Sequence, residues 1–346
     1  MFESVMWQYI RQQQDVLLQV MKDEKIKEVA KKMKNVWDLL IVAHGSSYNA
    51  AITIAPYFEQ VAGIHVQCMT PSQLAHRGVG DFNGFCIGIS QTGTSQGVID
   101  AIGNLKEKGL STLAITNEVL SPLDQLCDDG LYLECGQEDS NAKTKGYSAT
   151  CLVLMRLALE IGLINEKMTE KDYYQANETC REEISELEQV IQVATHYFQE
   201  HEFGKEAKNF IFVGDGIHFG TAMEGQIKLM ETMGIPTMFN DMIEFSHGMH
   251  RAINKDSILV FIDDGSESDL VEKSVKYFKN IGTTVLHISN KSLADIRISN
   301  YGFTHSLFSF IAVIQVLSVF VPELNGLDPN RELNEDYTKI VSTRIE

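Results

Sequence analysis

An internal repeat constrains the fold of this chain more than any other feature of its sequence. Residues 87–117 align without a gap on residues 260–290, and the segment 42–45 aligns on the segment 213–216. The aligned pairs are Val42 with Val213, Gly45 with Gly216, Gly109 with Gly282, and Asn117 with Asn290. Self-similarity over such a distance indicates two copies of one structural unit. The chain is therefore predicted to contain two similar domains.

Each copy alternates short apolar runs with segments of helical character. In the first copy, the apolar runs 39–43, 85–90 and 112–116 are predicted to be buried strands. The segment 96–108 is predicted to be a helix that ends at Gly109. Continuous apolar strands that alternate with helices are typical of a parallel sheet covered on both faces. We therefore predict the α/β class, with two doubly wound parallel-sheet domains related by the internal repeat.

The domain boundaries follow from the repeat. We expect an N-terminal helix at 1–34, a first domain at 35–165, a connecting helix at 166–204, and a second domain with the C-terminal tail at 205–346. The connecting segment is rich in Glu and Gln and has one apolar helical stripe, which is typical of a helix with a solvated face. The apolar run 307–321 is too short and too often interrupted by polar residues to span a bilayer, so it is predicted to be a buried helix.

The acidic composition of the chain restricts the kinds of partner that it can bind. The chain has 47 acidic and 29 basic residues, and its net charge of −18 disfavours nucleic acid and anionic membranes as partners. The hydrophobic content of 44% is typical of a compact globular protein. The six cysteines form no C-x-x-C pair and show no zinc-ligand spacing, so no metal site is predicted. The N-terminus lacks the apolar core of a signal peptide, and a soluble cytoplasmic protein is expected.

Two polar turns follow strands of the first copy that are expected to be neighbours, one at 45–47 and one at 90–95. Hydroxyl groups, backbone N–H groups and a helix N-terminus concentrate the positive potential that a phosphate requires. Such residues also serve as helix caps. However, ligands of open α/β sheets bind outside the carboxyl ends of the strands, where both turns are expected. The expected phosphate-binding residues are Ser46, Ser47, Ser90, Gln91, Thr92 and Ser95.

The second copy differs from the first at the matching strand end. Asp263 and Asp264 stand there, and their charges would repel an anion, so only the first copy is expected to hold a phosphate. The turn 214–216 has the glycines that begin a dinucleotide-binding motif, but the next glycine, Gly220, comes one position too late. No acidic residue for a ribose follows, and a Walker A lysine motif is absent. No nucleotide cofactor is predicted.

A charged stripe marks the predicted helix 222–233. Glu224, Lys228 and Glu231 lie on one face of this helix. Surface salt bridges often form such stripes. Here, however, the helix follows a strand and a glycine-rich turn, and His247 follows in a Ser-His-Gly loop. A carboxylate and an imidazole are the usual pair for moving a proton between adjacent sugar carbons, so the stripe is either a surface ion network or part of an active site.

With these motifs together, the chain resembles the SIS (sugar isomerase) proteins from about residue 35 to its C-terminus. It is most similar to the isomerase half of glucosamine-6-phosphate synthase and to the fructosamine-6-phosphate deglycases. Four motifs carry the resemblance, in the order and with the gaps found in the family. They are Gly45-Ser46-Ser47-Tyr48-Asn49, Ser90-Gln91-Thr92-Gly93-Thr94-Ser95, Glu224-Gly225-Gln226-Ile227-Lys228-Leu229-Met230-Glu231, and Glu244-Phe245-Ser246-His247-Gly248.

The resemblance implies an assembly and a set of catalytic roles. It implies two SIS-type domains and a homodimer in which the His247 loop of one subunit completes the active site of its neighbour. Glu231 is implied as the base that moves a proton between C1 and C2 of the sugar. His247 is implied as the group that opens the ring or protonates the leaving group, and Lys228 as the cation that holds the open chain or the charge of Glu231. No metal, nucleotide or other cofactor is implied.

Departures from the family pattern suggest an altered substrate on a retained phosphate site. Met249 replaces a proline of the family, and Lys143 replaces a serine that lies near the substrate. The family's C-terminal Schiff-base lysine finds its best match in Lys339, if a few residues are inserted before it. Asn141 and Glu224 complete the expected substrate contacts. No glutaminase domain precedes the SIS pair in this sequence, so glutamine is not expected to be the chain's own ammonia source.

Three functions remain in view. We expect an enzyme that acts on a 6-phosphorylated amino or aminodeoxy sugar, either as a fructosamine-6-phosphate-type deglycase or as an aldose–ketose isomerase. The first alternative is a regulatory protein that binds a phosphosugar without turnover, although such a sensor would not need Glu231 and His247. The second alternative is an aminotransferase-like paralogue of glucosamine-6-phosphate synthase, which the absence of a glutaminase domain disfavours.

Overall fold

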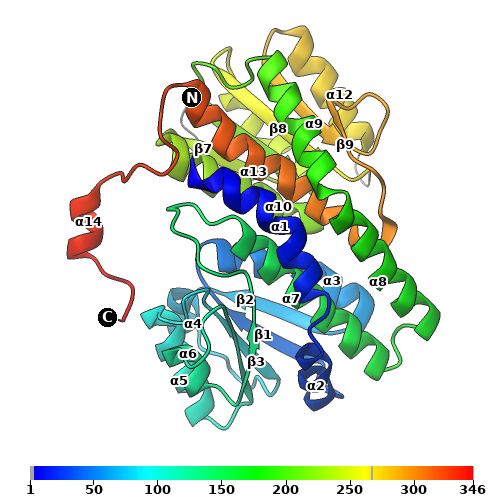
Figure 1. Cartoon of the computed structure of the whole chain (residues 1–346), viewed down its shortest axis with the longest axis vertical. Helices are drawn as coiled ribbons and strands as arrows, with labels where there is room; N and C mark the ends of the chain where they lie inside the picture. Colours follow the sequence, from blue (N-terminus) through cyan, green and yellow to red (C-terminus); the bar gives the residue numbers. More distant parts are fainter. Residues whose placement is uncertain (1–3, 266–267, 346) are drawn as a thin grey trace. The chain divides into compact units, whose positions relative to one another are not determined.

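The computed structural model describes residues 4–265 and 268–345 (Figure 1). The contacts among these residues divide them into two compact groups. The group called the N-half here comprises residues 15–138, residues 145–177 and the tail that begins at Asn334. The group called the C-half comprises the residues up to Gln14, the loop 139–144 and the segment 178–333. Each half contains one parallel sheet.

The N-half is built on five parallel strands in the order β2-β1-β3-β4-β5. The strands are β1 (Asp38–Val42), β2 (His65–Met69), β3 (Phe85–Ile89), β4 (Thr112–Thr116) and β5 (Asp129–Tyr132). Every residue of β3 and β4 is buried, as expected for strands in a sheet covered on both faces. The structure thus has strands at the three apolar runs predicted for this half.

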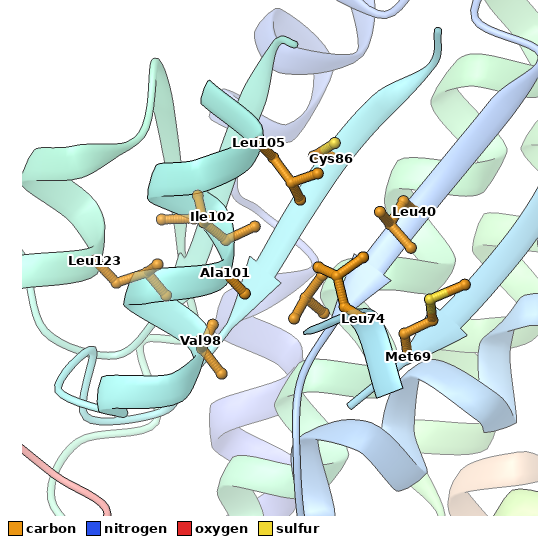
Figure 2. Close-up of a cluster of buried hydrophobic side chains, with 11 residues drawn as sticks. Leu40, Met69, Leu74, Cys86, Val98, Ala101, Ile102, Leu105 and Leu123 are labelled. Atoms are coloured by element: carbon orange, nitrogen blue, oxygen red, sulfur yellow. The ribbon is translucent and has the colours of Figure 1, made fainter. Parts of the chain in front are cut away.

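Helices connect these strands and cover the sheet. They are α2 (Lys25–Lys32), α3 (Ser46–Ala62), α4 (Pro71–Arg77), α5 (Gln96–Glu107), α6 (Pro122–Leu126) and α7 (Lys145–Ile164). The tail adds the short helix α14 (Glu335–Ile340). Figure 2 shows the part of the core where side chains of β1, β2 and β3 meet α4, α5 and α6. Cys86 belongs to this cluster, and burial raises the pKa of its thiol to about 12, so it acts as an apolar core residue.

The C-half repeats the same topology. Its five strands are parallel in the order β7-β6-β8-β9-β10, which matches the N-half strand for strand. The strands are β6 (Asn209–Gly214), β7 (Thr237–Asn240), β8 (Ser257–Asp263), β9 (Thr284–Ser289) and β10 (Ile296–Arg297). The helices are α9 (Leu187–Glu200), α10 (Ile217–Met233), α11 (Met242–His247), α12 (Ser268–Asn280) and α13 (Leu307–Leu324). The α/β class and the internal repeat are therefore confirmed.

Two helices are long and apolar enough to cross a membrane by length and composition alone. They are α7 and α13, and 89% of the apolar window of each is buried inside the protein. Because α13 runs from Leu307 to Leu324, it is longer than the run 307–321 that sequence patterns indicated. The prediction that this segment is a buried helix is confirmed.

Two segments expected to be single helices are each broken in two. The N-terminal segment forms α1 (Val5–Val20) and α2, and Arg156 donates hydrogen bonds to the carbonyls of Val20 and Asp23 at the break, at 2.7 and 2.8 Å. The connecting segment forms α8 (Glu170–Ser185) and α9. The break there lies at Glu186, whose carboxylate accepts a hydrogen bond from the Tyr301 hydroxyl. Tertiary partners, which helical periodicity cannot reveal, therefore stabilise both breaks.

The C-terminal tail also differs from the expectation. Sequence boundaries assigned it to the second domain, whereas its contacts group it with the N-half. The reason is a backbone hydrogen bond from Gln96 to Thr343 at 3.1 Å and another from Ile345 to Thr94 at 3.0 Å. The tail is thus held at the beginning of α5.

Candidate active site

The first long helix begins in the same way in both halves. Gly45 precedes α3 with φ of 60°, and Gly216 precedes α10 with φ of 54°, a left-handed conformation that favours glycine. The helix α3 follows β1, and α10 follows β6. In each sheet the order of the strands reverses beside this strand, between β1 and β3 in the N-half and between β6 and β8 in the C-half. Doubly wound sheets bind ligands at this switch point. Each half therefore offers one natural ligand position.

In the N-half, the loop Ser90–Ser95, called the phosphate loop here, follows β3 at this position. The hydroxyls of Ser90 and Ser95 lie 2.9 Å apart, and those of Thr92 and Thr94 lie 2.8 Å apart. Gly93 makes the tight turn with φ of 65°, and a Cβ atom there would lie 2.0 Å from the Ser121 hydroxyl oxygen. The loop thus gathers hydroxyl groups around a position that only glycine can occupy.

The turn after β1 supplies the other expected contacts. Ser46 and Ser47 are the first two residues of α3 and are half-buried. Because β1 pairs directly with β3, this turn and the phosphate loop lie at neighbouring strand ends. The expected phosphate-binding residues therefore share one edge of the N-half sheet, around the N-termini of α3 and α5.

Gln91 is held by a residue that sequence reasoning did not single out. Its side-chain amide donates to Glu138 at 3.0 Å. The buried Glu138 carboxylate also accepts the backbone N–H groups of Lys145 at 3.1 Å and Gly146 at 2.9 Å, so it caps the N-terminus of α7. Glu138 thus fixes the phosphate loop to α7. Its position before a helix was the only sequence signal, and that signal is weak.

The C-half carries the charged stripe. On α10, the Lys228 ammonium lies 2.9 Å from a carboxylate oxygen of Glu224 and 3.5 Å from one of Glu231. Lys228 is 0% exposed and Glu224 is buried, whereas the Glu231 side chain is 35% exposed. A buried ammonium needs close carboxylates to offset its desolvation. The structure therefore brings these three side chains together, with Glu231 as the member that solvent reaches.

The charges of the cluster act on the basicity of Glu231. Burial raises the pKa of the Glu231 carboxyl, the Lys228 ammonium lowers it, and the Glu224 carboxylate raises it. Lys143 also lowers this pKa, and its ammonium donates to the Ser140 carbonyl at 3.0 Å. The net direction is upward, so Glu231 is a stronger base than an exposed glutamate.

Three further expected residues lie outside this cluster. His247 is exposed at the C-terminal end of α11. The side-chain amide of Asn141 donates to the backbone carbonyls of Asn330 at 2.9 Å and Arg331 at 3.1 Å. Lys339 belongs to α14, but its side chain is outside the described part of the structure. The roles assigned to these residues remain predictions.

The C-half position that matches the phosphate loop is filled by an acidic side chain. The buried Asp263 carboxylate accepts the Gly265 N–H at 2.8 Å and lies 3.2 Å from a ring nitrogen of His287 and 3.1 Å from the Ser289 hydroxyl. Residues 266 and 267 of this loop lie outside the described residues. Within 4–265 and 268–345, no three His, Cys, Asp or Glu side chains are grouped so as to hold a metal ion.

The chain is similar to several known proteins in sequence and in fold. The glutamine–fructose-6-phosphate aminotransferase (isomerizing) of Thermococcus kodakarensis is 25% identical over 324 residues, which are 90% of this chain and 53% of the relative. A Clostridium difficile 630 protein, solved as a candidate phosphosugar isomerase, superposes with a TM-score of 0.89 at 26% identity, covering 99% of each chain. Glucosamine-6-phosphate deaminase of Thermotoga maritima has a TM-score of 0.79 at 24% identity, covering 95% of this chain and 97% of its own.

The chain spans about half the length of the curated relatives that it matches first. The SIS domain model matches residues 33–160 and 205–301, one segment for each copy of the repeat. These two segments contain the phosphate loop, the charged stripe of α10 and His247. The chain belongs to the SIS domain family.

Proposed function

We propose that this protein is an enzyme that processes a 6-phosphorylated amino or aminodeoxy sugar, as a fructosamine-6-phosphate-type deglycase or as an aldose–ketose isomerase. The observation that carries the proposal is the cluster on α10, in which the buried Lys228 lies between Glu224 and the partly exposed Glu231. A surface ion network would have no need to bury its ammonium completely. A protein that only binds a sugar would have no need of a carboxylate with raised basicity.

Both reactions need the same proton transfer. In the isomerase, Glu231 removes the proton from the carbon next to the carbonyl and returns it to the adjacent carbon, so that carbonyl and hydroxyl exchange places. In the deglycase, the transfer converts a 1-amino ketose into a C1 imine, which water hydrolyses to the aldose phosphate and the free amine. The Lys228 ammonium is buried, so it acts through Glu231, whose negative charge it stabilises.

The N-half supplies the anchor for the substrate. The hydroxyls of the phosphate loop and the N-termini of α3 and α5 suit a phosphate monoester. The names of the relatives agree with this assignment, since the Thermococcus protein acts on fructose 6-phosphate and the Thermotoga protein on glucosamine 6-phosphate. We infer that the N-half binds the phosphate of the substrate.

We further infer a homodimer in which His247 serves the active site of the partner subunit. The support is the exposure of its side chain at the C-terminal end of α11. An imidazole that acts in the active site of a neighbouring subunit must be exposed on the surface of its own subunit. His247 would protonate the leaving group or the ring oxygen.

A substrate screen tests the proposal. The purified protein is incubated with 6-phosphorylated Amadori compounds, glucosamine 6-phosphate and fructose 6-phosphate, the last with and without ammonia. Released amine, sugar product and exchange of the C1 or C2 hydrogen with D₂O are measured, with Glu231→Gln in parallel. Turnover by the wild type that Glu231→Gln loses supports the enzyme. Binding of a phosphosugar with neither turnover nor exchange would instead establish a sensor, and product formed only with ammonia would establish an aminotransferase-like synthase.

A further inference from the structure

The C-terminal tail brings an arginine to the phosphate loop. Backbone hydrogen bonds of Thr343 and Ile345 to the beginning of α5 flank an antiparallel bridge between Ser95 and Arg344. Ser95 is the last residue of the phosphate loop and precedes α5 directly. The pairing therefore fixes the backbone of Arg344 at the turn that follows β3.

The charge of Arg344 acts on the other turn of the same edge. The Arg344 side chain is exposed, and His44 directly precedes the glycine-serine turn after β1. Partial burial lowers the pKa of His44, and the Arg344 charge lowers it further, because a nearby cation disfavours protonation of the imidazole. Since β1 pairs with β3, the backbone of Arg344 lies at one turn of the edge, and its charge acts on a residue beside the neighbouring turn.

The tail thereby changes the electrostatics of the phosphate position. The Thr343 carbonyl accepts the first amide of α5, so this amide is not available to an anion while the tail is docked. The serine and threonine hydroxyls of the edge carry no formal charge. A guanidinium forms short, charge-assisted and often bidentate hydrogen bonds to phosphate. The docked tail therefore occupies one neutral donor, the Gln96 N–H, and adds one cation, Arg344, at this edge of the sheet.

We propose that Arg344 is a phosphate-binding residue, and that the tail completes the anion site of the N-half and favours phosphorylated over unphosphorylated sugars. This inference rests on the proposed function, because it assigns the substrate phosphate to this edge. None of the four sequence motifs contains Arg344, and the tail lies outside the aligned segments of the repeat. The residue is therefore a specificity determinant that the motifs do not include.

Calorimetric titration with fructose 6-phosphate and with inorganic phosphate tests the role of Arg344 separately from turnover. We expect Arg344→Ala to weaken the binding of both anions about tenfold or more, and Arg344→Glu to weaken it further. Arg344→Lys should keep part of the affinity, since it keeps the charge but not the planar fork. Arg77→Ala, which removes an exposed arginine from the last turn of α4, is the matched control and should bind as the wild type does. Thermal unfolding confirms that each variant is folded.

The outcomes separate this inference from the proposed function. Arg344→Ala that binds phosphate as tightly as the wild type, while Ser90→Ala with Thr92→Ala binds it weakly, would overturn the role of Arg344 and leave the phosphate site intact. Tighter binding by Arg344→Ala would also overturn it and would identify the tail as a competitor of the anion. A wild type that turns over no phosphosugar but depends on Arg344 for phosphate binding would refute the enzyme and keep the inference.

Discussion

At the switch point of each sheet, the two halves have the same strand order but different side chains: hydroxyl groups in the N-half and a carboxylate in the C-half. In the N-half, the strand β3 leads into Ser90 and a loop of hydroxyl groups. In the C-half, the strand β8 ends at Asp263, whose carboxylate occupies the donors of its own loop and of β9. The Asp263 carboxylate thus accepts hydrogen bonds in the C-half as a bound anion would in the N-half. The fold thus sets the location of the site, and the side chains decide whether it takes up a ligand.

The helices α3 and α10 differ in the opposite sense: here the C-half carries the functional side chains and the N-half does not. In the C-half, α10 carries Glu224, Lys228 and Glu231. The matching positions of α3 are Thr53, Tyr57 and Gln60, counted from the shared glycine before each helix. These side chains carry no charge, and Thr53 forms a 2.9 Å hydrogen bond with the Tyr147 hydroxyl. The loop of hydroxyl groups therefore belongs to the N-half alone, and the charged stripe belongs to the C-half alone.

The largest effect is expected from removing the charge of Glu231. Glu231→Gln is nearly isosteric, so substrate binding should survive while kcat and D₂O exchange fall about 10²- to 10⁴-fold, because a positioned general base is lost. Glu59→Gln, which removes an exposed charge from α3, is the matched control and should leave kcat unchanged. Glu224→Gln should mainly reduce stability, since it leaves the buried Lys228 with a weaker partner. Near-normal turnover by Glu231→Gln would refute the mechanism.

The next effect concerns His247 and the assembly. His247→Ala should lower kcat, whereas His76→Ala, near the end of α4 in the matching position of the N-half, should not. If the active site is shared, mixing inactive Glu231→Gln and His247→Ala proteins should restore about a quarter of the wild-type activity, since half of the dimers are mixed and each has one intact site. A mixture that stays inactive after proven subunit exchange would place both residues in one chain.

A smaller effect is expected at the two strand ends. Ser90→Ala combined with Thr92→Ala should weaken phosphosugar binding, each lost hydrogen bond to the anion contributing about 1.5–3 kcal/mol, or roughly tenfold or more. Asp263→Asn should leave the affinity unchanged, because the C-half position is closed by its own hydrogen bonds. The measurement is calorimetric titration of fructose 6-phosphate. Loss of binding in Asp263→Asn alone would reverse the assignment of the two halves.

Local patterns predicted the strands and the charged stripe, since burial of a parallel strand and the face of a helix both leave a regular spacing in the sequence. The position of the phosphate loop could be predicted because it follows such a strand. The role of Glu138 could not, because its partners Gln91 and Lys145 lie on separate elements. The docking of the tail was missed for the same reason. Pairing between Ser95 and Arg344 spans most of the chain and leaves no periodic signal.

The smallest effect, on stability, tests whether Asp263 is the built-in anion of the C-half. Burial alone would raise the pKa of this carboxyl, but hydrogen bonds from His287, the Gly265 N–H and Ser289 outweigh burial and hold the pKa below its ordinary value of 3.8. A lowered pKa in the folded state means that the carboxylate stabilises the fold above the unfolded value of 3.8. That contribution is lost as the pH falls through the folded value.

Asp263→Asn should therefore reduce the free energy of unfolding by about 1–3 kcal/mol at pH 7, because the amide weakens the charge-assisted bonds. The difference from the wild type should shrink as the pH falls below 3.8, where the wild-type carboxyl becomes protonated and resembles the amide. Urea unfolding between pH 7 and pH 3 measures both quantities, with the exposed Asp81→Asn as control. A difference that stays constant over this range would show that Asp263 acts through packing, and the C-half position would then need another explanation for its failure to hold a phosphate.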